Sequence, residues 1–247
     1  MTTVLKISIR SFLIIGMLFL YANFISAQQI KIHSHNDYRQ NVPFYQAYAQ
    51  KLASIEADIY ATENENELLV AHDPHELSEA LTIDALYITP LVNLFSQNNG
   101  RAWKDSDALI TLLVDLKTPV YPTLDRLIAK LQKYPEVFNP EINPYARRVV
   151  ISGNRPDPDK FETYPPGISF DGSKTNYTPA QLKRISMISL NLRDYARWNG
   201  KGTIKADEYQ KVLKAIDEVH RLGKPIRFWG TPDGVTAWNT FHAIGGE

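Results

Sequence analysis

The sequence contains no cysteine, and this absence excludes several kinds of site at once. Disulfide bonds, thiolate metal sites, a cysteine nucleophile and a lipid-modified N-terminal cysteine are all ruled out. A chain without disulfides must be held together by its apolar core, and 247 residues with 44% hydrophobic content suffice for one. We therefore expect one large domain without covalent cross-links.

An excess of charge of one sign is also missing, because 27 Lys and Arg balance 27 Asp and Glu. A nucleic-acid groove or a polybasic membrane patch would need surplus positive charge, so neither is expected. The sequence also lacks a Gly-rich dinucleotide loop and a P-loop after its first predicted strand, which argues against a doubly wound nucleotide-binding fold. Any functional charges must therefore be concentrated locally.

Residues 1–27 have the pattern of a secretory signal peptide. Lys6 and Arg10 precede an apolar run at 11–24, and an Ile-Ser-Ala motif that resembles a cleavage site ends the segment. The alternative is an uncleaved membrane anchor, but the run is shorter than the roughly 20 residues that a spanning helix needs. We expect an exported protein, periplasmic or secreted, with its domain at 28–247 and no stable membrane span after cleavage.

Short apolar strands alternate with helices along the rest of the chain. The predicted strands are 29–33, 54–60, 68–71, 108–114, 148–152, 167–170, 185–190 and 225–228. The predicted helices are 43–52, 83–95, 121–134, 205–222 and 236–243. Strands that alternate with helices indicate a parallel sheet covered by helices.

The number of strands predicts an incomplete barrel. About seven barrel-type strands fit into the mature chain, which is shorter than the roughly 250 residues of a typical eightfold barrel. The sequence ends at Glu247, where an eighth strand would begin. We therefore expect an α/β fold of the TIM-type (β/α)8 barrel kind that lacks its last strand, in a single domain and as a monomer.

Acidic and histidine side chains lie at the carboxyl ends of the early strands, where barrel active sites are found. Glu56 and Asp58 are two positions apart in one strand, so their side chains point to the same side. Two like charges on one strand are costly to bury, and a hard divalent cation with oxygen ligands removes that cost. His35 follows the first strand and His72 follows the third, which adds two imidazoles to the same end.

A second polar pair, Asp115 and Lys117, follows the very apolar strand 108–114. The pair could be an ordinary surface ion pair, but its place at the end of a buried strand favours a functional role. Three carboxylates and two imidazoles are thus expected at one end of the sheet. We expect the three carboxylates to bind one divalent cation, Mg²⁺ or Ca²⁺.

The order of these residues resembles the phospholipase C-like phosphodiesterase superfamily, which includes the glycerophosphodiester phosphodiesterases and the sphingomyelinase D enzymes. In particular, the sequence is similar to the family named altered inheritance of mitochondria protein 6. The segments that carry this resemblance are His35-Asn36-Asp37-Tyr38, Ile55-Glu56-Ala57-Asp58-Ile59, Leu68-Leu69-Val70-Ala71-His72-Asp73, Asp115-Leu116-Lys117, Arg227-Phe228-Trp229 and Thr231-Pro232-Asp233.

The resemblance implies a metal-dependent phosphoric diester hydrolase that acts on glycerophosphodiester- or phospholipid-type substrates. The roles that it implies are acid–base catalysis for His35 and His72, metal binding for Glu56, Asp58 and Asp115, and phosphate contact for Lys117. The chain departs from the common glycerophosphodiesterase pattern in having His35-Asn36-Asp37 in place of His-Arg-Gly, so an arginine contact to phosphate is missing. Any ligand on the last strand is missing as well.

Three further residues are candidates for contact with the substrate. Asn36 stands next to His35, and Asn154 follows the strand 148–152. Trp229 matches an aromatic residue near the sphingomyelinase D site, although an aromatic side chain at a strand end can equally serve packing.

Other interpretations remain open at this point. His33 and His35 form a His-x-His pair that also occurs in amidohydrolase-type barrels, but the later His220 and His242 lie in predicted helices. His33 is expected to be a packed or partly exposed strand residue, and His75 to lie at the surface. The protein could also be a non-catalytic barrel that binds phosphorylated or sugar ligands, or a phosphomonoesterase on the same metal site.

Overall fold

The computed structural model describes residues 31–64 and 67–246. The expected signal peptide and most of the predicted first strand lie outside these residues. Lys31–Glu247 is one unit by its internal contacts. Within the described part of the chain, no helix is both long enough and apolar enough to span a bilayer.

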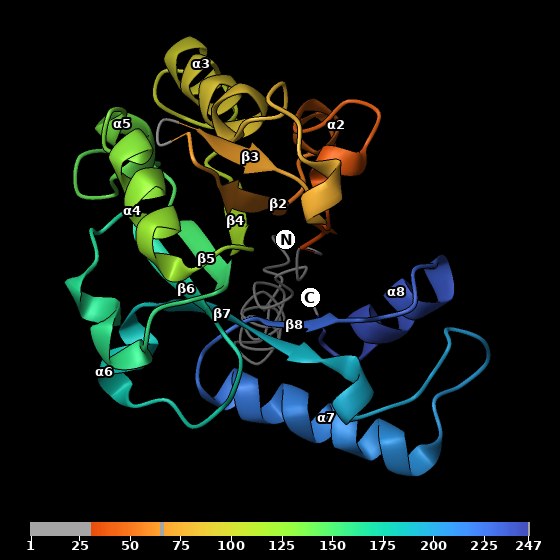
Figure 1. The fold of residues 1–247 in the computed structure, drawn as a ribbon. Coiled ribbons are helices and arrows are strands. Elements are labelled where there is room, and N and C mark those ends of the chain that lie inside the picture. Colours follow the sequence, from red (N-terminus) through yellow and green to blue (C-terminus); the bar gives the residue numbers. More distant parts are fainter. Residues whose placement is uncertain (1–30, 65–66, 247) are drawn as a thin grey trace, which may run out of the picture. The chain divides into compact units, whose positions relative to one another are not determined.

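Seven strands form one curled parallel sheet with the order β1-β2-β4-β5-β6-β7-β8 (Figure 1). Their bounds are β1 His33–Ser34, β2 Ser54–Ala61, β4 Thr111–Leu116, β5 Val149–Gly153, β6 Ile168–Gly172, β7 Ile185–Asn191 and β8 Ile226–Trp229. An eighth strand, β3 Leu68–Val70, pairs antiparallel with β2 outside this order. β1 and β8 are the two ends of the series, so the prediction of a TIM-type barrel that lacks one strand is confirmed.

Helices surround the curled sheet on its outer side (Figure 1). Their bounds are α2 Tyr45–Ala49, α3 Thr89–Gln97, α4 Val120–Leu131, α5 Pro135–Phe138, α6 Pro179–Lys183, α7 Ala206–Arg221 and α8 Val235–Ala243. Short 3-10 or π turns occupy η2 Asp37–Arg39, η3 Pro74–Glu76, η4 Asp84–Ile88, η5 Pro158–Thr163 and η6 Leu192–Asp194. The longest helix, α7, buries the four aliphatic residues of its predicted apolar face and ends before Gly223, whose φ of 68° suits a helix C-terminus.

The two faces of the sheet differ in chemistry because side chains alternate along each strand. Ile55, Ala57 and Ile59 of β2 belong to the hydrophobic core, which lies between the sheet and the helices. Glu56 and Asp58 point the other way, into the barrel. The fold therefore places apolar residues under the helices and leaves its polar strand residues facing one interior.

Several predicted boundaries were wrong. The predicted strand 108–114 is observed as β4, which begins three residues later and ends two residues later, so Asp115 lies inside the strand and not after it. The predicted helix 43–52 shortens to α2, because Phe44 has a φ of 64° and cannot continue a helix. The helix α6 was not predicted, although Thr178 and Gln181 form a capping box at its start.

Candidate active site

The inner face of the sheet carries a row of polar side chains near the carboxyl ends of the strands. The strand register places Asp58 of β2 beside Asp115 of β4, and Asp115 beside Ser152 of β5. Farther along the sheet, Ser189 of β7 lies beside Arg227 of β8. Parallel strands bring these ends together, so groups from distant parts of the sequence share one site.

Glu56, Asp58 and Asp115 form an acidic triad on β2 and β4. Each offers one carboxylate oxygen, and these three atoms lie within 4.8 Å of one another. Glu56 and Asp58 are buried, with 4% and 1% of their surface exposed, and Asp115 is partly buried. Like charges this close repel unless cations neutralise them. The side chains that contact the three carboxylates therefore decide what the triad can bind.

The two carboxylate oxygens of Asp58 have different surroundings. Oδ2 lies 3.0 Å from the Tyr38 hydroxyl, from Nδ1 of His72 and from Nζ of Lys117. Oδ1 is buried and has no hydrogen-bond partner among the described residues. A buried oxygen without a partner costs free energy, whereas a hard divalent cation takes such oxygens as ligands. The donor set of the triad therefore fits a cation of this kind.

Glu56 is held in its ionised form by residues of the two edge strands. Its Oε2 atom lies 2.7 Å from Nε2 of His33 on β1 and 2.9 Å from Nη1 of Arg227 on β8. Burial by itself raises the pKa of Glu56, but the hydrogen bond with His33 and the charge of Arg227 outweigh it and lower the pKa to about 2. Burial lowers the pKa of His33, in spite of its contact with Glu56. These contacts join the two edges of the sheet through side chains.

Lys117 is the second cationic side chain in contact with the triad. Its Nζ atom lies 3.0 Å from Asp58 and 3.4 Å from Asp115. Burial lowers the pKa of Lys117, but the two carboxylates outweigh it and raise the pKa above its usual value. Burial raises the pKa of Asp115, and Lys117 reduces that effect without reversing it. An ammonium group has three donors, so two ion pairs leave one for a ligand.

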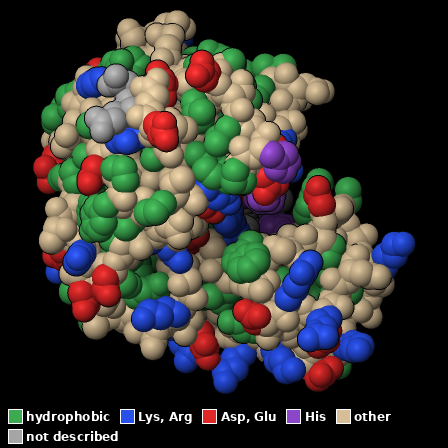
Figure 2. Space-filling view, viewed as in Figure 1, with side chains coloured by type: hydrophobic (Ala, Val, Ile, Leu, Met, Phe, Trp, Pro, Cys, Tyr) green, Lys and Arg blue, Asp and Glu red, His purple; other side chains and the backbone are tan. Residues whose placement is uncertain are grey.

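The two predicted catalytic histidines differ in how they are held. Nδ1 of His72 lies 3.0 Å from Asp58, which leaves its Nε2 for a substrate. His35 is exposed, its ring lies 6.4 Å from that of His33, and it forms no hydrogen bond within residues 31–64 and 67–246. Figure 2 shows histidine side chains beside Lys or Arg side chains in a hollow of the surface.

An ion pair joins the loops that carry these histidines. Nη2 of Arg39, which follows His35 in η2, lies 2.6 Å from Oε1 of Glu76. Oε2 of Glu76 accepts hydrogen bonds from the backbone N–H groups of His72, at 3.1 Å, and Asp73, at 3.2 Å. Glu76 therefore fixes the backbone at His72 and ties it to the loop of His35.

Asp37, the third residue of the His35-Asn36-Asp37 segment, has a structural role. Its buried carboxylate accepts hydrogen bonds from Ser34 Oγ at 2.7 Å, the Phe44 backbone N–H at 2.5 Å and the Tyr87 hydroxyl at 3.1 Å. These three bonds hold the loop after β1 against α2 and η4, and so position His35.

The predicted substrate contacts lie around the same strand ends. Asn36 has left-handed backbone angles, and its Oδ1 lies 3.1 Å from the Tyr38 hydroxyl. The side-chain amide of Asn154 donates to the carbonyl oxygen of Thr118 at 3.1 Å. Trp229 ends β8 and is 50% exposed. Their contact with a substrate stays a prediction.

The sequence did not predict the contacts of Tyr38 with Asp58 and of His33 and Arg227 with Glu56. It also did not predict that Asp171 is buried. A signal was present in two cases. Arg227 interrupts an otherwise apolar strand, and Asp171 is the last residue but one of another, at positions where an ordinary core strand would carry an apolar residue.

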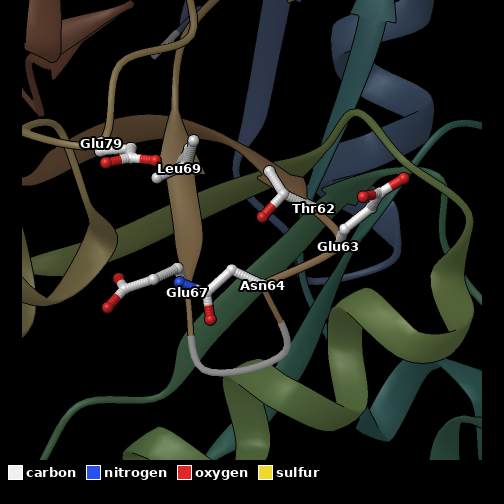
Figure 3. Close-up of a pocket in the computed structure, with 6 residues that line it drawn as sticks. All are labelled: Thr62, Glu63, Asn64, Glu67, Leu69 and Glu79. Atoms are coloured by element: carbon white, nitrogen blue, oxygen red, sulfur yellow. The ribbon is translucent and has the colours of Figure 1, made fainter.

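Two other acidic features do not coincide with the triad. Asp73, His75 and Glu76 could also hold an ion, but His75 and Glu76 are exposed, and His75 was expected at the surface. A cavity of about 340 Å³ is lined by Thr62, Glu63, Asn64, Glu67, Leu69 and Glu79. Figure 3 shows that its carboxylates do not converge, since that of Glu63 points away from the other two. We assign no chemistry to either feature.

Comparison with known families bears directly on this arrangement. Residues 23–139 match the AIM6-like phosphodiesterase domain, and this segment contains the acidic triad, both catalytic candidates and Lys117. The predicted resemblance to the AIM6 family is confirmed.

Two curated relatives carry the family's full name, altered inheritance of mitochondria protein 6. The protein from Eremothecium gossypii is 29% identical over 237 residues, which are 82% of this chain and 61% of the relative. The protein from Lachancea thermotolerans is 30% identical over 251 residues, which are 82% of this chain and 57% of the relative. The chain thus spans about three fifths of the length of these AIM6 relatives.

Two solved structures also align with this chain. A glycerophosphodiester phosphodiesterase from Parabacteroides distasonis is 15% identical, with a TM-score of 0.49 and coverage of 87% of this chain and 90% of that one. A protein from Silicibacter pomeroyi, named as a glycerophosphoryl diester phosphodiesterase, is 12% identical, with a TM-score of 0.48 and coverage of 88% of both chains.

Proposed function

We propose that the protein is a metal-dependent phosphoric diester hydrolase whose reaction takes place over the acidic triad. The observation that carries the proposal is the buried, unpartnered Oδ1 of Asp58, which lies in a group of three converging carboxylates. The match to a phosphodiesterase domain over residues 23–139 supports the same reaction class.

The local charge balance supports a divalent cation and an anionic substrate. Three carboxylates contact two cationic side chains, Lys117 and Arg227, so one negative charge remains uncompensated. A bound divalent cation makes the site net positive, which matches the single negative charge of a phosphodiester. Such a cation supplies Lewis-acid polarisation of a phosphoryl oxygen. Either Mg²⁺ or Ca²⁺ fits a set of carboxylate ligands.

The chain's own residues supply binding and proton transfer. Lys117 contacts an anionic phosphoryl oxygen with the N–H that its two ion pairs leave available. His35, which is exposed, removes the proton of the nucleophile. His72, held through Nδ1 by Asp58, delivers a proton from Nε2 to the leaving alkoxide. The nucleophile is either water or a hydroxyl of the substrate itself.

Hydrolysis of bis-p-nitrophenyl phosphate tests this proposal. We expect turnover that a chelator abolishes and that Mg²⁺ or Ca²⁺ restores. His35→Ala and His72→Ala should each lower kcat by about 10²-fold or more, because each removes a proton-transfer group. His220→Ala is the matched control, because His220 is exposed on α7 and should leave kcat unchanged.

The outcomes separate the three activities that the sequence left open. Absence of chelator-sensitive turnover in the full-length chain would indicate a barrel that binds phosphorylated or sugar ligands without hydrolysing them. Faster turnover of p-nitrophenyl phosphate than of the diester would indicate a phosphomonoesterase. The retention of both His35 and His72 favours an enzyme over a binding barrel, because binding alone does not require an acid–base pair.

The natural substrate and the location of the protein are part of the proposal. We propose a glycerophosphodiester or phospholipid substrate on the basis of the family resemblance. We also propose export through cleavage after residue 27, on the basis of the sequence pattern at 1–27. N-terminal sequencing of the protein from a native host checks the second point, since an intact N-terminus at Met1 would contradict it.

A further inference from the structure

His72 is held in place by three contacts, two from β2 and one from η3. Its ring nitrogen Nδ1 lies 3.0 Å from Oδ2 of Asp58. Its backbone carbonyl oxygen accepts a hydrogen bond at 2.8 Å from the hydroxyl of Tyr60, a buried residue of β2. Its backbone N–H donates to Oε2 of Glu76 at 3.1 Å. The ring and both sides of the backbone are thus fixed, and with them the place of Nε2, the proposed proton donor.

Glu76 differs from the other two partners of His72, because it also reaches a second loop. Its Oε1 atom lies 2.6 Å from Nη2 of Arg39, a residue 37 positions earlier at the end of η2. Arg39 belongs to the segment that begins with His35, the proposed base. The hydrogen bond from Arg39 and those from the backbone lower the pKa of Glu76 to about 2, so its carboxylate stays ionised at neutral pH. The ion pair therefore links the loop of His35 to that of His72.

The pair of Arg39 and Glu76 contributes little to the stability of the fold. The two side chains are 47% and 35% exposed, and ion pairs that water screens in this way stabilise proteins only weakly. The proposed reaction, in contrast, depends on where the two histidines lie, since one removes a proton at the attacking oxygen and the other supplies one at the leaving oxygen. A displacement of about 1 Å can cost about 10²-fold in rate. A contact between the two histidine loops therefore matters more for catalysis than for folding.

We propose that Arg39 and Glu76 are positioning residues, whose ion pair fixes His72 relative to His35 for proton transfer. The inference rests on the proposed diesterase function, because that function assigns the proton transfers to these two histidines. Neither positioning residue contacts the acidic triad in the described part of the chain, so cation binding does not depend on them. Their effect is expected on kcat and not on KM, since His72 acts on the leaving oxygen in the transition state.

Two diesters with leaving groups of different basicity test this role. Bis-p-nitrophenyl phosphate and diphenyl phosphate share one skeleton, but phenolate is a stronger base than p-nitrophenolate and depends more on a donated proton. We expect Glu76→Ala to lower kcat about tenfold with the first diester and at least about fiftyfold with the second, with KM changed less than about twofold. Equal losses of kcat with the two diesters would show a general disturbance of the site and overturn the proposal.

A double-variant cycle tests whether the two residues act through one contact. Arg39→Ala leaves the backbone bonds of Glu76 in place, so it should lower kcat by at least about threefold but less than Glu76→Ala does. Arg39→Lys, which keeps the charge, should recover part of this loss. The double variant should be no slower than Glu76→Ala, because both substitutions remove the same link. Losses that multiply in the double variant would overturn the proposal, as would a raised KM in Arg39→Ala, which would identify a direct contact with the substrate.

The ion pair of Arg101 with Asp107 supplies the matched control. It also joins an arginine to a carboxylate at the surface, and among the described residues neither member contacts the candidate active site. Asp107→Asn should leave kcat unchanged with both diesters. Calorimetry with Mg²⁺ or Ca²⁺ separates the positioning pair from the triad. Glu76→Ala should bind the cation as tightly as the wild type, and a weaker affinity in this variant would overturn the proposal.

Hydrogen exchange separates failure of this inference from failure of the proposed function. If the wild type hydrolyses neither diester, the proposed function fails, and NMR of the His72 and Asp73 amides decides whether the pair holds their loop. Both amides donate to Oε2 of Glu76. Their exchange should become at least about tenfold faster in Glu76→Ala and should also speed up in Arg39→Ala, but not in Asp107→Asn. Unchanged exchange in Glu76→Ala would reject Arg39 and Glu76 as positioning residues.

Discussion

Glu56 and Arg227 form a buried ion pair whose members depend on each other. Arg227 Nη1 lies 2.9 Å from Glu56 Oε2, and both side chains are about 90% or more buried. Removal of one partner from a buried pair leaves the other charge without compensation and costs about 3–5 kcal/mol. We expect Arg227→Met to lower the free energy of unfolding in urea by that amount. The double variant with Glu56→Gln should recover part of the loss, and a purely additive double variant would contradict the coupling.

The buried carboxylate of Asp171 is predicted to reduce the stability of the fold at neutral pH. Burial raises the pKa of Asp171, so the folded protein holds a proton there more tightly than the unfolded chain. Stability is therefore lost as pH rises from the unfolded pKa, about 3.9, through the raised folded pKa.

Asp171→Asn should remove this loss. We expect its free energy of unfolding to exceed that of the wild type by about 1–3 kcal/mol at pH 7, with the difference disappearing below about pH 4. Urea unfolding of both proteins from pH 3 to pH 8 measures this. A variant that is less stable than the wild type at pH 7 would show that the ionised carboxylate stabilises the fold.

At the scale of elements, the end of β5 sets the position of the triad residue on β4. Gly153 has a φ of 67°, and a Cβ atom there would collide with Oδ1 of Asp115 and with the backbone of Leu116. Gly153→Ala should therefore displace Asp115 and weaken cation binding at least tenfold by calorimetry. It should also cost about 1–2 kcal/mol of stability from the left-handed backbone alone.

Gly202→Ala separates these two effects. Gly202 has a similar φ of 62°, but a Cβ atom there would meet nothing within 4 Å. The control should carry the backbone cost without any change in cation affinity. Equal loss of cation affinity in both variants would contradict a specific role of Gly153 at the triad.

The sequence predicted elements well where the signal is local. The alternation of strands and helices and the spacing of Glu56 and Asp58 gave the fold and two of the triad positions. The edges of β4 were misplaced, because the apolar residues that precede Thr111 resemble those inside the strand. Asp171 and Arg227 were missed because one polar residue in an apolar strand does not show by itself which other polar residues share its face, and only the register between strands places the two on one inner face.

At the scale of the whole molecule, the site depends on complete folding of the sheet. The contact between Arg227 and His33 spans 194 positions in the sequence and joins the two edge strands. A ligand that binds only the folded site stabilises the fold by mass action, about 2.7 kcal/mol at 100 times its Kd. For a domain of this size we expect Mg²⁺ or Ca²⁺ to raise Tm by about 5–10 °C. Asp58→Asn should not show the rise.

The central claim is that Glu56, Asp58 and Asp115 hold one divalent cation at the mouth of the barrel. Crystals grown with Mn²⁺ as a substitute ion, and measured for anomalous scattering, test this claim most directly. The account predicts one strong anomalous peak among the three carboxylates, next to Asp58 Oδ1. A map with no peak there, or with its peak at Asp73, His75 and Glu76, would contradict it.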